Sequence, residues 1–104
     1  MALFNPAIQP VSTTAGTPKS TTLDTTASKN LMPANAARFG VAINNNATAN
    51  LYINLGSAAS STNYVAILAP GGYYETPFGY TGDVNGIIVA KTNVSGTVVA
   101  TEFT

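Results

Sequence analysis

The feature that most constrains the fold is the alternation of apolar and other residues in short runs between turn-forming residues. The pattern is clearest at 39–43 and recurs at 51–55, after the Asn-rich stretch 44–48. A period of two matches the side-chain geometry of a half-buried β-strand. Asn tolerates the left-handed backbone conformations that tight turns need. We therefore expect the two runs to be strands that pair as a hairpin around this turn.

Four more short runs follow, each bounded by Gly, Pro or Asn. They span 63–69, 73–77, 83–92 and 97–104, and the first of them is apolar on both faces. The Thr-rich stretch 21–32 suits one or two edge strands or an extended segment, because Thr is a good strand former. Seven or eight short strands at this spacing are typical of an all-β sandwich or barrel, and no useful length of chain has a helical period.

The first 20 residues differ from the rest because prolines recur at positions 6, 10 and 18. Proline fixes φ and lacks a backbone donor, so neither a helix nor a central strand can run through this part. We therefore predict an extended N-terminal arm at 1–20. An antiparallel β-sandwich or jelly-roll-like domain is predicted to follow at 21–104. Gly86, inside one of the runs, indicates a bulge or a close backbone approach.

The arm carries spaced apolar side chains, which suit docking onto another chain. These residues are Leu3, Phe4, Ile8 and Val11. The alternative is a frayed terminus with incidental hydrophobic residues. The Thr-rich stretch 13–26 likewise suits strand addition to a neighbour's sheet, or a solvated linker between arm and domain.

The composition excludes several classes of function. The chain has no Cys and no His, which removes disulfides, thiolate nucleophiles, imidazole bases and the common transition-metal sites. Only 8% of its residues are charged, with four cations and no net charge, so it cannot neutralise many phosphates and we expect no nucleic-acid partner. No apolar run approaches the ~20 residues that span a bilayer, so no membrane partner is expected either. We also expect no cofactor and no enzymatic activity.

Two charged residues stand out in so uncharged a chain. Arg38, beside the first alternating run, suits a salt bridge or hydrogen bonds to a partner chain, or is an exposed charge at a strand end. Glu75 suits a structural contact with Arg38 or with turn amides. A catalytic interpretation needs a second carboxylate, and nothing in the spacing favours any one of Asp24, Asp83 and Glu102.

Four aromatic residues crowd around two turns, namely Tyr73, Tyr74, Phe78 and Tyr80. Such a cluster suits a core plug at one end of a sandwich, a protein interface or a platform for stacking sugars. Alternation along a strand places Tyr73 and Glu75 on one face and Tyr74 on the other. One of the two tyrosines should therefore be in the core and the other outside.

Several segments, taken in order, resemble a module that recurs among virion proteins of tailed bacteriophages. They are ANAARFGVAINN, ANLYINLG, NYVAILAPGGYYETP, YTGDVNGI and VATEF, within residues 34–104. The module is similar to small β-sandwich capsid decoration (cement) proteins and to modules of head fibres and tail-associated proteins. The resemblance brings no catalytic residues with it.

The resemblance implies a decoration protein on the outer capsid surface of the virion. The expected partners are the major capsid protein and further copies of the chain, as a trimer. The arm residues, Arg38 and the four aromatic residues are then the expected interface. The alternatives are a head-fibre or tail-fibre module that binds host glycans, or a head-closure or neck component.

Overall fold

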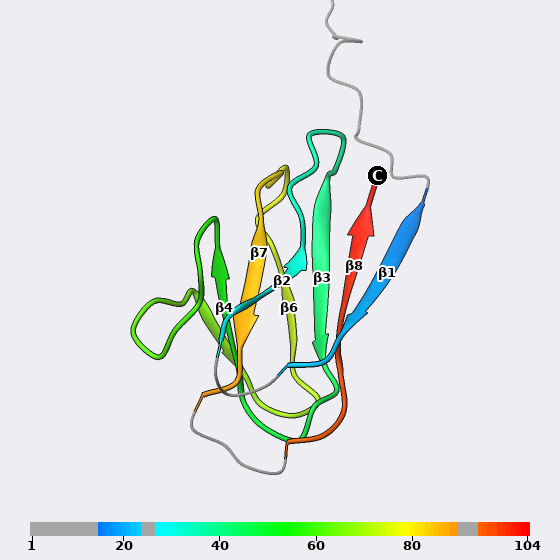
Figure 1. Ribbon diagram of the computed structural model, residues 1–104. Helices are drawn as coiled ribbons and strands as arrows, with labels where there is room; N and C mark the ends of the chain where they lie inside the picture. Colours follow the sequence, from blue (N-terminus) through cyan, green and yellow to red (C-terminus); the bar gives the residue numbers. More distant parts are fainter. Residues whose placement is uncertain (1–14, 24–26, 90–93) are drawn as a thin grey trace, which may run out of the picture.

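A computed structural model describes residues 15–23, 27–89 and 94–104 (Figure 1). The described residues form strands and connecting turns with no helix, so the all-β expectation is confirmed. The strands are β1 (Gly16–Thr21), β2 (Lys29–Met32), β3 (Gly40–Asn45), β4 (Leu51–Leu55), β5 (Ala66–Leu68), β6 (Tyr73–Glu75), β7 (Val84–Ile87) and β8 (Val98–Phe103). The proposed arm anchors Leu3, Phe4, Ile8 and Val11 lie outside the described residues, as does Asp24.

The strands form two four-stranded antiparallel sheets that pack face to face as a sandwich. One has the order β1-β8-β3-β6 and the other β2-β7-β4-β5. Among the eight described strands, the only sequential neighbours that pair are β4 and β5. Elsewhere the chain passes from one sheet to the other between successive strands.

The expected hairpin between the first two alternating runs is wrong, because β3 and β4 lie in different sheets. The buried amide of Asn45 explains the crossing. Its Nδ2 donates to the carbonyl oxygens of Ala49 and Leu68, both at 2.9 Å, and its Oδ1 accepts from the Ala47 N–H. These bonds hold the 46–50 segment as an arch between the sheets, so both strands turn their apolar faces into one core.

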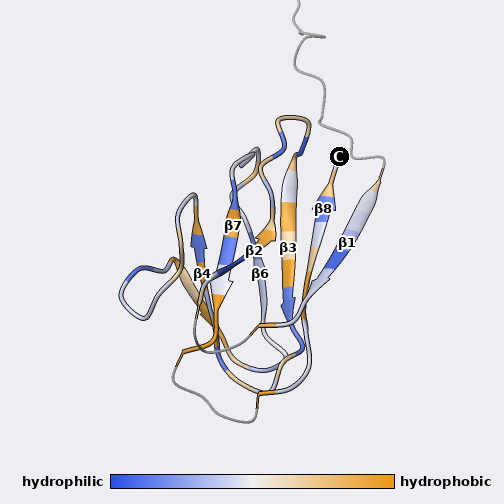
Figure 2. Ribbon diagram, in the orientation of Figure 1, coloured by the Kyte–Doolittle hydropathy of each residue, from blue (hydrophilic) through white to orange (hydrophobic). Residues whose placement is uncertain are grey.

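The core lies between the sheets and is built from the alternating apolar positions. Figure 2 shows the apolar middle of β3 with polar residues at its end. The cluster includes Val41, Ile43, Leu51, Ile53, Leu31, Val84, Ile88, Val98 and Ala100. Gly86 is a site of close approach, since a Cβ there would lie 2.8 Å from Leu31 Cδ1 and 3.0 Å from Leu51 Cδ1.

The sandwich begins earlier in the chain than the sequence indicates. Residues 16–20, expected in the arm, belong to β1, which pairs with β8 from Gly16↔Phe103 to Thr21↔Val98. The Thr104 N–H donates to the Ala15 carbonyl oxygen, so the backbone groups of Ala15 face β8. Along an antiparallel strand, successive residues direct these groups alternately toward and away from the partner strand, so the Pro18 nitrogen faces the free edge of the sheet. Proline is tolerated there because no ladder hydrogen bond is lost. Residues 16–21, which belong to the Thr-rich stretch 13–26, therefore add a strand to a sheet of their own chain.

Candidate functional site

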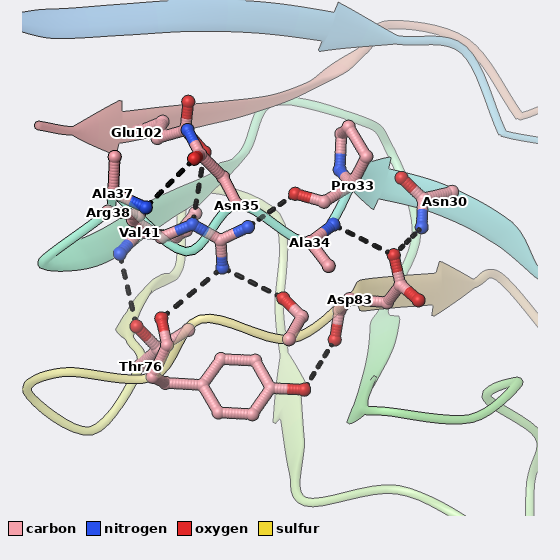
Figure 3. Close-up of polar contacts among 12 residues, drawn as sticks. Asn30, Pro33, Ala34, Asn35, Ala37, Arg38, Val41, Thr76, Asp83 and Glu102 are labelled. Atoms are coloured by element: carbon pink, nitrogen blue, oxygen red, sulfur yellow. Dashed lines mark hydrogen bonds and ion pairs between the residues drawn. The ribbon is translucent and has the colours of Figure 1, made fainter.

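Arg38 lies two residues before β3 and is buried, with only 2% of its surface exposed. Its Nε donates to Glu102 Oε2 at 3.0 Å. Its Nη1 donates to the carbonyl oxygens of Gly82 at 2.8 Å and Tyr80 at 3.4 Å, and its Nη2 donates to that of Pro33 (Figure 3). A buried charge is stable only when it is paired and hydrogen-bonded, and Arg38 meets both conditions inside its own chain.

This placement corrects the interpretation of Arg38 from sequence. The side chain is neither an exposed strand-end charge nor available to a partner, and its carboxylate partner is Glu102 rather than Glu75. The bonds of Arg38 join the end of β8, the segment after β2 and the loop 76–83. Arg38 is therefore a positioning residue for that loop.

The loop 76–83 is held at several further points. Its first residue, Thr76, accepts from the Val41 N–H through Oγ1 at 3.0 Å. At its other end, the Tyr80 hydroxyl donates to the Asp83 carbonyl oxygen at 2.7 Å. The Asp83 carboxylate in turn accepts from the Ala34 N–H at 3.0 Å (Figure 3). These hydrogen bonds hold the loop 76–83 at both of its ends.

Phe78 projects from the tip of this loop. The Tyr80 N–H donates to the Pro77 carbonyl oxygen, and Gly79 has a φ of 82°, which together define a type II turn with Phe78 at its first corner. A side chain at that corner points away from the body of the protein. Phe78 is accordingly 75% exposed, more than any other large hydrophobic residue among those described.

A hollow of about 250 Å³ lies beside Phe78, on the outer face of the sheet that contains β3. Its lining residues are Phe39, Gly40, Val41, Glu75, Thr76, Phe78 and Phe103. Gly40 lies opposite Phe103 in the ladder and contributes no side chain. The lining is mostly apolar, with one carboxylate, so the hollow suits an apolar side chain.

The other aromatic candidates divide as alternation predicts. Tyr74 packs against the core, whereas Tyr73 is exposed and its hydroxyl donates to Glu75 Oε2 at 2.6 Å. This hydrogen bond is the main reason that the pKa of Tyr73 is raised, while burial raises the pKa of Tyr74. Tyr80 also packs against the core. Of the four, Tyr73 and Phe78 therefore face solvent and Tyr74 and Tyr80 support the loop from within.

A second exposed apolar patch lies on the outer face of the other sheet, and the sequence analysis did not single it out. Tyr52 of β4 lies between its cross-strand partners Ile67 and Ile87. Tyr64 packs edge-on against Tyr52, with ring centroids 5.2 Å apart, and Val65 is 51% exposed. The sequence does contain a sign of this patch, because the run 63–69 is apolar on both faces although only one face meets the core. We call these five residues the β4–β5 patch.

Each of the described carboxylates has a hydrogen-bond or ion-pair partner that is not another carboxylate. Glu75 accepts from Tyr73, Asp83 from Ala34, and Glu102 pairs with Arg38. The described part of the chain contains no group of three or more potential metal-ligating residues. Within residues 15–23, 27–89 and 94–104, no helix has the length and apolarity needed to cross a membrane.

Compared with known proteins, the chain matches no family model, no curated protein and no solved structure. Its site is therefore judged on its own chemistry. That chemistry consists of an exposed aromatic residue, Phe78, on a hydrogen-bonded loop and an adjacent, mostly apolar hollow that is also lined by Glu75. Such a surface is suited to binding another macromolecule.

Proposed function

We propose that the chain is a capsid decoration (cement) protein of a tailed bacteriophage. It binds the outer surface of the head and stabilises contacts between major capsid subunits. The exposure of Phe78 on a loop held by buried Arg38 carries the binding part of this proposal. The sequence resemblance supplies the phage part.

A fixed aromatic residue is an efficient anchor for a protein partner. Aromatic residues are enriched in interface cores, and a loop that is already ordered loses little entropy on binding. Phe78 and Glu75 line the hollow, and exposed Tyr73 donates its hydroxyl hydrogen bond to Glu75. The arm residues Leu3 and Phe4 add further apolar contacts in this proposal.

We also propose that the protein acts as a homo-oligomer, with the trimer expected from the resemblance. The β4–β5 patch is the candidate subunit contact, because it places five apolar or aromatic side chains on one outer face. Copies joined in this way bind a symmetric surface with avidity. Because they bind the assembled shell and not the separated subunits, they stabilise the shell by mass action.

A second candidate function is glycan binding by a head-fibre or tail-fibre module. The observation that favours it is the placement of Glu75 in the hollow next to exposed Phe78. Sugars are bound by aromatic stacking together with hydrogen bonds to carboxylates. A head-closure or neck component would show the same fold at a different virion location.

The test is add-back of purified protein to heads that lack it, followed by cryo-electron microscopy with the chain traced into density. We expect density over the outer head surface, and Phe78→Ser should weaken binding at least tenfold, as loss of an interface anchor does. The matched control is Pro70→Ser, at the same corner of the type II turn Ala69–Gly72. Density confined to a fibre or neck, or unchanged binding of Phe78→Ser, contradicts the proposal.

A further inference from the structure

The hollow beside Phe78 exists because one strand position lacks a side chain. A Cβ added at Gly40 would meet nothing closer than Thr76 Oγ1, at 3.9 Å. On the other side of β8, a Cβ at Gly16 would lie 3.2 Å from the ring of Phe103. The Phe103 ring thus covers Gly16 and leaves the space above Gly40 open. An apolar side chain can enter that space without displacing any other.

The described chain starts next to this hollow. The Ala15 carbonyl oxygen accepts from the Thr104 N–H at 3.1 Å, and Gly16 lies opposite Phe103. Figure 1 shows the start of β1 beside the C-terminal end of β8. Fourteen residues precede Ala15, and we use the name arm for these residues, 1–14, from here on. The arm therefore joins the sandwich one strand away from a hollow-lining aromatic residue.

The distances suit two of the arm's apolar residues. Gly40 lies two strands from β1, which is about 10 Å at the usual strand spacing. Val11 precedes Ala15 by four residues, a reach of about 13 Å when extended, and Ile8 by seven, a reach of about 23 Å. Both side chains can therefore reach the hollow, and Leu3 and Phe4 can extend beyond it.

We propose that the hollow is the docking site for residues 8–11 of the chain's own arm. The arm has no charged side chain, which suits an apolar lining. Pro10 restricts the unfolded arm and so lowers the entropy lost on docking. A short tether gives an effective concentration on the order of millimolar, so the chain's own arm outcompetes that of a second copy in dilute solution. The inference stands whether or not the partner of Phe78 is a capsid.

The experiment measures nuclear Overhauser effects in the full chain with ¹³C-labelled Ile, Leu and Val methyl groups. We expect contacts from the Ile8 and Val11 methyl protons to the Phe103 ring. Gly40→Val should abolish them, because it fills the hollow with a residue that favours strands. Asn44→Val, an exposed position on the same face of β3, should leave them intact. Absence of the contacts in the unsubstituted chain, or their survival in Gly40→Val, overturns the proposal.

A second pair of variants keeps the test independent of the folding of Gly40→Val. Replacing Ile8 and Val11 together with Ser should shift the ring resonances of Phe103, whereas replacing Leu3 and Phe4 with Ser should not. Equal effects of the two double variants contradict docking of 8–11. Mixing labelled with unlabelled protein then shows whether residues 8–11 and the hollow that they contact belong to the same molecule. Contacts between different molecules overturn docking within one chain.

Discussion

The Nε atom of Arg38 lies 3.0 Å from Glu102 Oε2, a contact between residues 64 positions apart in the chain. The Arg38 side chain is fully buried and that of Glu102 is 14% exposed. One guanidinium thus joins the end of β8 and the segment after β2 to the loop that presents Phe78. The stability of the fold and the shape of the candidate site depend on the same group.

Replacing Arg38 with Met should lower the free energy of unfolding by about 3–5 kcal/mol, because it leaves Glu102 and three carbonyl oxygens without their donor. Urea unfolding followed by circular dichroism measures the change. The control is Lys19→Met. Lys19 is exposed, and the hydrogen bond that the structure shows for its side chain goes to the Asn30 carbonyl oxygen. A loss below 1 kcal/mol for Arg38→Met contradicts the assigned role.

Gly96→Ala should destabilise the protein more than Gly71→Ala does. Both glycines have a left-handed φ, 87° and 84°, so each substitution carries the same backbone strain of about 1–2 kcal/mol. A Cβ at Gly96 would also lie 2.3 Å from the Asn46 carbonyl oxygen, whereas nothing lies within 4 Å at Gly71. We expect a difference of at least ~1 kcal/mol in thermal unfolding. Equal losses would show that the turn moves away from Asn46 without cost.

Glu75→Ala should lower the pKa of Tyr73 toward its ordinary value of 10.0. The substitution removes the hydrogen bond and the negative charge that raise this pKa. The pKa of Tyr74 should stay raised, because burial is its cause. Titration of the tyrosine ¹³Cζ resonances separates the two. A raised pKa favours the neutral phenol, so any stabilisation from Tyr73 is present below pH 10 and is lost as the pH rises through the raised pKa.

Ile67→Lys should reduce self-association if the β4–β5 patch joins copies of the chain. The charge would be placed next to Tyr52, its cross-strand partner, and would lose water in a subunit contact. Sedimentation equilibrium should show an oligomer for the unsubstituted chain and a shift toward monomer for this variant. Thr62→Lys, at an exposed loop position, is the control. A monomeric unsubstituted chain at all concentrations contradicts the proposed contact.

Apart from β1, which lies mostly in the segment expected to be an arm, the sequence predicted the strands and many of their turns, because both depend on local properties. Alternation at 39–43 and 51–55 corresponds to β3 and β4, and Tyr73 and Tyr74 of β6 divide between solvent and core as a period of two requires. Pro70 followed by glycines marked the turn that precedes β6. None of these features needs information from a distant part of the chain.

The pairing of the strands could not be predicted in the same way. Local alternation says that a strand has an apolar face, but not which sheet contains it. The hydrogen bonds of Asn45 to Ala49 and Leu68 made the 46–50 segment an arch between sheets. The pairing of β1 with β8 likewise joins the first and the last described strands, and no nearby residue signals it.

The sequence by itself determined an all-β chain of short strands with few charged residues and no Cys or His. The tertiary structure decided which of its few charges and aromatic residues face water. Arg38 became buried because Glu102 and three backbone carbonyl oxygens converge on it from separate segments. Phe78 stayed exposed because that network holds its turn away from the core. Burial depends on partners that the fold brings together, so spacing along the chain alone did not reveal it.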